Sequence, residues 1–231
     1  MAFLFALNKY FLCAGLLYFI ASPVASHTCT DGSIFKKLVA AVFIYSLIQT
    51  LSVIFGDFMQ ELLNTLDATI GKLGARACFN KPASKNEIEN LEDFISVTIP
   101  SDLKEFYLTH NGGFFATATW TETELSDKTQ FGLIHWNSNH FLTLEKIKEI
   151  FSYVDAVSNV TMDENPSEQY IPFFQTKDQE YLVLQLSKKE TNKPILKLVR
   201  QTAPEHWIKF SNDFAEFLER YIEKKGDILT Y

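Results

Sequence analysis

Few side chains in this sequence are spaced in a way that could support catalysis or metal binding. His135 and His140 stand five residues apart and, with Glu145, supply side-chain types that bind zinc, but no zinc motif surrounds them. We therefore expect histidines at the surface or partly buried. Cys78 would need a distant histidine to act as a nucleophile, and its neighbours match no thiol-enzyme motif. The sequence has no Gly-rich phosphate loop and no Gly-x-Ser-x-Gly turn. We predict a protein that is not an enzyme, with no catalytic residue, cofactor or metal.

Acidic and aromatic side chains indicate a surface for a protein partner instead. Glu122, Glu124 and Asp127 lie in one short segment, TETELSD. Such a loop is ordinarily solvated, but it could also face a partner with a basic surface. Trp120 and Trp136 could be contact anchors, because tryptophan is enriched in binding hot spots, and core packing is their alternative role. These five residues are the predicted partner-binding set.

Composition narrows the class of protein further. The chain has 231 residues, a formal net charge of −7 and 47% hydrophobic residues, which excludes wholesale disorder. A general binder of phosphate backbones would be basic, so we expect no direct contact with nucleic acid. Charges in residues 1–75 cancel, whereas residues 76–231 carry the whole −7. This asymmetry predicts a domain boundary.

The N-terminal quarter is predicted to lie at a membrane. Residues 1–26 contain an apolar run after Lys9 and small residues up to Ser26, which fits a signal peptide. An uncleaved first membrane helix is the alternative, and both remain open. Residues 38–56 begin with 18 uncharged residues, close to the roughly 20 that cross a bilayer, and predict a transmembrane helix. A buried helix is its alternative.

The membrane topology stays open at this stage. Lys36 and Lys37 favour a cytoplasmic start of the second apolar run, whereas a cleaved signal peptide would place that start outside. The side of the membrane that carries the C-terminal domain is therefore unresolved. Residues 57–83 are predicted to form a juxtamembrane stalk that begins with an amphipathic helix, with a partner-binding helix as the alternative.

Residues 84–224 predict one α+β domain with a mostly antiparallel sheet covered by helices. Ser84 and Glu87 form a capping box at the start of a helix. Pro100 ends any continuation, and Ser101 is expected to cap a second helix. That helix ends at Asn111-Gly112-Gly113, where glycine tolerates a positive φ, and His110 is expected to pack near this turn.

The strands that follow are predicted from alternation and turn residues. Segments 116–120 and 131–136 are candidates, and 170–174 is expected to be a short edge strand because Pro172 lacks a ladder donor. Segments 181–186 and 195–200 form the clearest hairpin. Two further helices are expected, one capped by Thr143 and one over 214–222, where apolar residues recur at helical spacing.

The order of these motifs resembles the SUKH superfamily, which includes fungal cell-wall regulators and bacterial toxin-immunity proteins. The matching segments are a helix, Ile99-Pro100 where Leu-Pro is usual, an aromatic helix and Asn111-Gly112-Gly113. They are followed by the Ile-Pro strand at 170–174 and a closing helix at 211–222. The resemblance covers about residues 84–223 and implies an α+β domain that binds other proteins without chemistry of its own. The N-terminal membrane segment departs from the common members.

Two functions remain in competition. One is a membrane-anchored module that neutralises a toxin protein, that is, an immunity protein. The other is a membrane-tethered regulatory scaffold in cell-envelope or cell-wall assembly. Both predict a protein partner, and neither partner can be named from the sequence.

Overall fold

The computed structural model describes residues 32–116, 121, 137–158, 168–187, 193–199 and 202–228. The side chains of residues 32–40, 43 and 47–57 lie outside this description. The chain divides into two compact units, Met1–Gly56 and Asp57–Tyr231. The predicted signal peptide or first membrane helix, residues 1–26, lies outside the described residues, as does the candidate strand 131–136. Of the candidate strand 116–120, only Ala116 is described, and it lies just after strand β2 (Gly113–Phe115).

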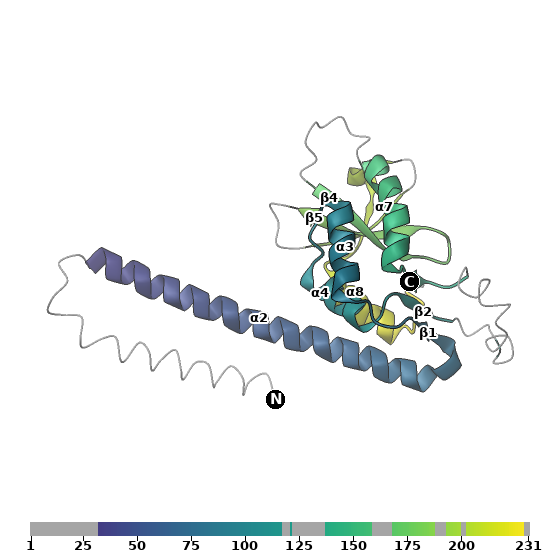
Figure 1. The fold of residues 1–231 in the computed structure, drawn as a ribbon, viewed down its shortest axis with the longest axis horizontal. Helices are drawn as coiled ribbons and strands as arrows, with labels where there is room; N and C mark the ends of the chain where they lie inside the picture. Colours follow the sequence, from purple (N-terminus) through teal and green to yellow (C-terminus); the bar gives the residue numbers. More distant parts are fainter. Residues whose placement is uncertain are drawn as a thin grey trace. The chain divides into compact units, whose positions relative to one another are not determined.

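Helix α2 runs without interruption from Gly32 to Leu73 (Figure 1). The predicted transmembrane segment, residues 38–56, lies within this helix, but most of its side chains are outside the described set. The side chains of Val42, Ile44 and Tyr45 are described and are exposed. Among the described residues, no helix combines the length and the apolar character needed to cross a membrane.

The second unit includes the last turns of α2, which corrects the predicted stalk over residues 57–83. Met59, Leu62, Leu63 and Leu66 recur at helical spacing and are buried in the main hydrophobic core. A stalk would leave this stripe in solvent, whereas here it packs against the domain. A short 3₁₀ turn, η1 (Gly74–Arg76), then leads into the first strand of the sheet.

Within the described residues, seven antiparallel strands form one sheet, and strands that follow each other in sequence lie next to each other in space. This arrangement confirms the predicted α+β class with an antiparallel sheet. The strands are β1 (Ala77–Phe79), β2 (Gly113–Phe115), β3 (His140–Phe141), β4 (Glu168–Gln175), β5 (Tyr181–Ser187), β6 (Ile195–Lys197) and β7 (Ile208–Ser211).

Strand β4 corrects the edge position expected from Pro172. The strand lies inside the sheet and pairs with β3 on one side and with β5 on the other. Pro172 is tolerated there because the register shifts between Pro172 and Phe174, so that the missing N–H falls at an irregularity. The predicted antiparallel pairing of 181–186 with 195–200 is confirmed as β5 with β6, but β6 ends at Lys197 and is shorter than predicted.

Four helices of the second unit begin and end close to the predicted positions. They are α3 (Lys85–Ile95), α4 (Ser101–Thr109), α7 (Leu144–Ser158) and α8 (Phe214–Glu223), and the 3₁₀ turn η2 (Pro204–His206) precedes β7. The capping box of Ser84 and Glu87 is confirmed. The cap predicted for α4 is wrong by one residue, because Pro100 holds the N-cap position and Ser101 is the first helical residue.

Aromatic side chains fill the core between the sheet and helix α8. The ring of Phe141 lies 5.9 Å from that of Phe217 and 4.8 Å from that of Tyr221, centroid to centroid, both edge-on. Phe173 and Phe174 both contact Phe217, because the irregularity in β4 turns consecutive side chains toward the same helix. Edge-to-face pairs of this kind add specific geometry to the hydrophobic burial. The predicted apolar face of the last helix is confirmed.

Candidate functional site

The five residues predicted to bind a partner are Trp120, Glu122, Glu124, Asp127 and Trp136, and all of them lie outside the described residues. The structure describes the two ends of the segment that carries them. Strand β2 leads into this segment and strand β3 follows it, and the two strands pair through Gly113 with Phe141 and Phe114 with His140. The predicted binding segment therefore starts and returns at adjacent strands.

The Asn-Gly-Gly turn holds the start of strand β2, whose other end leads into the predicted binding segment. The side-chain oxygen of Asn111 accepts a hydrogen bond from the backbone N–H of Leu144 at 2.9 Å, which caps the start of α7. The backbone N–H of Asn111 donates to the carbonyl of Lys81, and the Asn80 side-chain amide donates to the carbonyl of Asn111. One residue thus joins α4, α7 and the segment before α3.

The two glycines of this turn are required by close backbone contacts. Gly112 has a φ of +78°, and a Cβ there would lie 2.8 Å from the carbonyl oxygen of Phe141. Gly113 has a φ of +146°, and a Cβ there would lie 2.6 Å from the Cα of Phe79 on β1. Both distances are too short for any side chain, so the predicted structural role of the turn has a steric cause.

Asn139 holds the β3 end, and the sequence analysis missed it. Its side-chain amide donates to the carbonyl of Gly226 at 2.8 Å, and its side-chain oxygen accepts from the backbone N–H of Lys177 at 2.9 Å. The hydroxyl of Tyr221 lies between the two ends, because it donates to the carbonyl of Asn139 and accepts from the N–H of Phe115. A lone asparagine in a loop carries no periodic signal, so only the structure shows this junction.

Two buried tyrosines of the core, Tyr107 and Tyr221, donate hydrogen bonds through their neutral hydroxyls. Desolvation raises the pKa of Tyr107 and of Tyr221 well above the ordinary value for tyrosine. The hydroxyl of Tyr107 donates to the carbonyl of Leu142, next to the Asn-Gly-Gly turn. The hydroxyls of Tyr107 and Tyr221 therefore fix the backbone near Asn111 and Asn139, and each is hydrogen-bonded within the domain.

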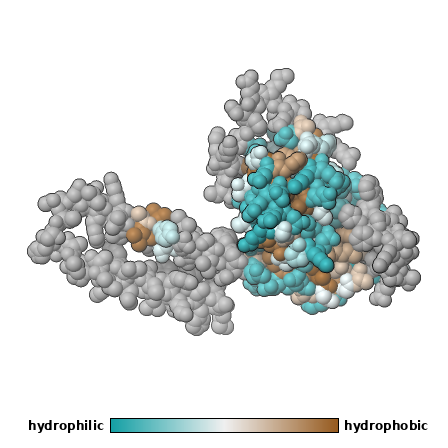
Figure 2. Space-filling model, viewed as in Figure 1, coloured by the Kyte–Doolittle hydropathy of each residue, from teal (hydrophilic) through white to brown (hydrophobic). Residues whose placement is uncertain are grey.

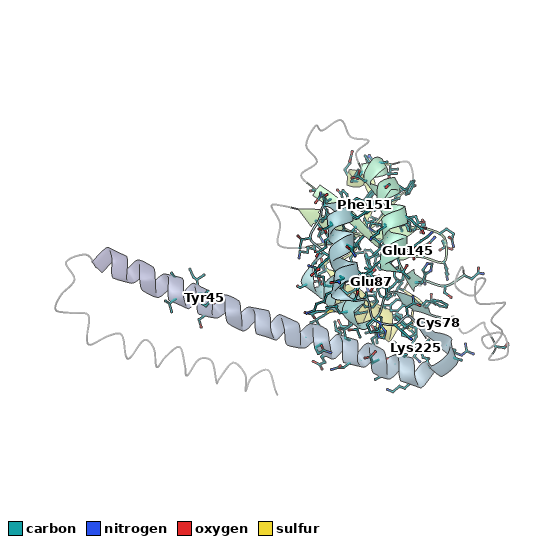
Figure 3. The ribbon with its side chains drawn as sticks, in the orientation of Figure 1. Tyr45, Cys78, Glu87, Glu145, Phe151 and Lys225 are labelled. Atoms are coloured by element: carbon teal, nitrogen blue, oxygen red, sulfur yellow. The ribbon has the colours of Figure 1, made fainter. Side chains whose placement is uncertain are left out.

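Of the residues considered for chemistry, His135 lies outside the described residues, whereas His140 and Cys78 have structural surroundings. His140 is buried, and its Nδ1 lies 2.9 Å from the carbonyl oxygen of Ser138. His110 packs beside the turn as predicted, with its ring 5.2 Å from that of Phe79. Cys78 projects from β1 (Figure 3), and burial raises the pKa of its thiol, which opposes formation of the thiolate. Within the described part of the chain, no three His, Cys, Asp or Glu side chains come together as a metal site.

The described surface over α3 and α7 is polar and partly acidic. Helix α3 holds four acidic residues and one lysine. Glu87 and Glu145 project from α3 and α7 in Figure 3, and Figure 2 shows mainly hydrophilic side chains on this face. Only isolated apolar side chains such as Phe94 and Tyr153 stand out from it.

Comparison with protein families assigns this domain. The model of the SMI1 / KNR4 family (SUKH-1) matches residues 82–220. The chain therefore belongs to the SMI1 / KNR4 family of the SUKH superfamily, as the motifs around Asn111-Gly112-Gly113 indicated. The comparison with curated proteins gave no match. This family includes toxin-immunity proteins and cell-wall regulators, and its domains often bind protein partners such as toxins.

Proposed function

We propose that this chain is a non-catalytic, membrane-anchored immunity protein that binds and neutralises a toxin protein. The observation that carries the proposal is the SUKH-1 match over residues 82–220, which places the C-terminal unit in a family with immunity members. The net charge of −7 supports a basic toxin domain as the partner, since opposite charge steers association and favours a close complex.

The segment between β2 and β3 is our proposed contact with the toxin. The strands at its two ends are held by hydrogen bonds of Asn111, just before β2, and of Asn139, just before β3, so the domain can present the segment at a fixed place. A rigid framework that carries a binding loop is a common arrangement in recognition proteins. Trp120, Glu122, Glu124, Asp127 and Trp136 remain the proposed contact residues.

Growth protection tests this function. The product of the neighbouring reading frame would be expressed in a susceptible host with and without this chain, and we expect growth only with it. Reversing the charges of Glu122, Glu124 and Asp127 to lysine should abolish protection, whereas reversing the exposed Glu89 and Asp93 on α3 and Asp155 on α7 should preserve it. Equal loss in both variants would remove the β2–β3 segment from the proposal, and no protection by the natural chain would remove the immunity role.

The membrane anchor is a second part of the proposal. It rests on the uncharged run of residues 38–55 and on the exposed side chains of Val42, Ile44 and Tyr45. Membrane fractionation and protease digestion of a C-terminal tag in cells without their outer barrier would test it. A membrane-bound, protected tag places the domain in the cytoplasm, and a membrane-bound, digested tag places it outside. A tag that fractionates away from membranes in unprocessed protein would contradict the anchor.

A membrane-tethered scaffold in cell-envelope assembly is the second candidate function. It is favoured by the same family match, because the family also includes cell-wall regulators. It differs in one measurable way: deletion of the gene should produce an envelope defect in the absence of any toxin. An immunity role predicts no such defect until the toxin is supplied.

A further inference from the structure

Residues 58–79 cover apolar surface of the SUKH domain although they precede the family match. The match begins at residue 82. Before that point, Met59, Leu62, Leu63 and Leu66 of α2 are buried in the same core as the matched residues. Strand β1 then pairs with β2 along one edge of the sheet. A helix and a strand from outside the matched region thus complete the domain.

We propose that this helix–strand segment is a ligand bound within its own chain. The domain carries a docking surface for an amphipathic helix followed by a short antiparallel strand, and residues 58–79, the cis segment, occupy it. The inference concerns this surface alone and does not depend on the immunity role. It also names the class of partner that could replace the cis segment, namely a protein segment with the same apolar spacing.

The helical part is held by apolar side chains and by one polar contact at the surface. The spacing 59, 62, 63 and 66 follows the i, i+3, i+4, i+7 pattern of helices that bind in grooves. The hydroxyls of Thr65 and Thr69 bond to carbonyls within the helix itself. The carboxylate of Asp67 lies 2.7 Å from Nε2 of His110, and the Asp67 side chain is 53% exposed.

The strand of the cis segment pairs with β2 at a position where β2 carries a glycine and therefore has no side chain. Phe79 pairs with Gly113, Cys78 with Phe114 and Ala77 with Phe115. A Cβ on Gly113 would collide with the Cα of Phe79, so the glycine leaves the space that the added strand fills. Strand addition to a sheet edge is a recognised mode of peptide binding.

The junction between helix and strand is loosely packed. Gly74 has a φ of +55°, and a Cβ built on it or on Gly71 would meet no atom within 4 Å. Leu73, between these two glycines, is partly buried against the core, so the core holds this joint less firmly than the fully buried stripe of α2. Such a joint allows helix and strand to detach and rebind without distortion of β4 and β5.

A cleavable version of the full chain tests the proposal. A protease site inserted between Lys81 and Pro82, both exposed, would be cut after folding, and a fluorescent peptide of residues 57–80 would then be added. We expect the peptide to exchange with the cut segment and its anisotropy to rise. The Leu63→Asp peptide should bind more than about tenfold more weakly, because it buries a charge. The Thr65→Asp peptide is the matched control, since Thr65 is exposed.

Hydrogen exchange on the uncut chain provides an independent measurement. Amides of residues 58–79 should exchange together and faster than those of β4 and β5, since a bound ligand opens below the global unfolding energy. Exchange of all these amides at one common rate would overturn the proposal. Equal binding of the natural and Leu63→Asp peptides would also overturn it, as would a dimer in which a second copy supplies the segment.

Discussion

The Asn-Gly-Gly turn and the last turns of α2 both hold the corner of the domain around β1 and β2, but they do so by different physics. At the turn, backbone atoms approach so closely that no Cβ fits at Gly112 or Gly113. At α2, the contact consists of buried apolar side chains and one polar contact between His110 and the exposed carboxylate of Asp67. The first contact depends on individual atoms, and the second depends on buried area.

This difference explains which of the two carries a recognisable sequence motif. A steric requirement admits glycine alone, so it leaves an Asn-Gly-Gly signature that can be read directly. A hydrophobic contact accepts many residues of similar size, so it leaves only a periodic pattern. The same pattern also suits a partner-binding helix or a membrane-surface helix, which is why the stalk interpretation of residues 57–83 was possible.

The largest effect is expected for Gly113→Ala. The new Cβ would lie 2.6 Å from the Cα of Phe79, and the φ of +146° is unfavourable for alanine. Overpacking and backbone strain together should lower the free energy of unfolding by about 4 kcal/mol. Urea denaturation followed by tryptophan fluorescence would measure the loss.

Gly71→Ala is the matched control for this substitution. Gly71 lies within α2, and a Cβ there would contact nothing within 4 Å. Alanine is favoured over glycine in a helix by about 1 kcal/mol, so this variant should be as stable as the natural chain or more stable. Equal destabilisation by both variants would show that the turn has no special steric requirement.

Leu63→Ala tests the area-dependent contact. Leu63 is 1% exposed, and truncation of a buried leucine costs about 3 kcal/mol through lost burial and the cavity left behind. The same denaturation measurement applies. Thr65→Ala, on the exposed side of the same helix, should change the stability by less than about 0.5 kcal/mol. A Leu63→Ala variant with unchanged stability would restore the stalk interpretation of this segment.

Asn111→Ala should have an intermediate effect. The substitution leaves the Leu144 N–H at the start of α7 without its acceptor, which costs about 2 kcal/mol for a partly buried donor. Asn111→Asp retains an acceptor at the same position and should recover most of the stability. Thermal unfolding of the two variants side by side would check this. If both lose stability equally, the hydrogen bond to α7 does not account for the role of Asn111.

The sequence predicted local features whose cause lies within a few residues, and it failed where distant segments meet. The capping box of Ser84, the Thr143 cap and the apolar face of α8 all depend on neighbours in the chain, and all are confirmed. Pro172 was expected at a sheet edge because proline lacks a backbone N–H, a property that the sequence alone reveals. The irregularity that accommodates Pro172 inside the sheet arises in the pairing of β4 with β5, which the sequence does not reveal. Asn139 joins three segments far apart in sequence, which no pattern reveals.

The sequence and the structure define the candidate binding site in different ways. The predicted partner-binding residues lie between β2 and β3, outside the described residues, so the structure informs only on their anchors. Acidic and aromatic residues in such a segment indicate which kind of partner surface they could contact, but they do not indicate how their side chains are arranged. The candidate site is therefore located along the chain by its sequence and in the fold by Asn111 and Asn139.

The smallest effect is expected at Asp102, and its sign depends on pH. Burial raises the pKa of this carboxyl in the folded state, and the nearby Asp213 adds to the rise while Lys193 opposes it. A raised pKa means that the folded state binds the proton more tightly than the unfolded chain does. Asp102 therefore lowers stability progressively as the pH rises from the ordinary aspartate pKa, about 3.9, through the raised value.

Asp102→Asn removes this titration while it keeps an oxygen that can accept from the backbone N–H of Leu103, as Asp102 does at 2.9 Å. We expect the variant to gain stability relative to the natural chain at pH 7 and to lose that gain near pH 3. Urea denaturation at the two pH values measures the difference. Asp93→Asn on the exposed side of α3 is the matched control for the loss of one carboxylate from a helix. A gain that is equal at both pH values would point to a change in packing, because only a titrating carboxyl makes the gain depend on pH.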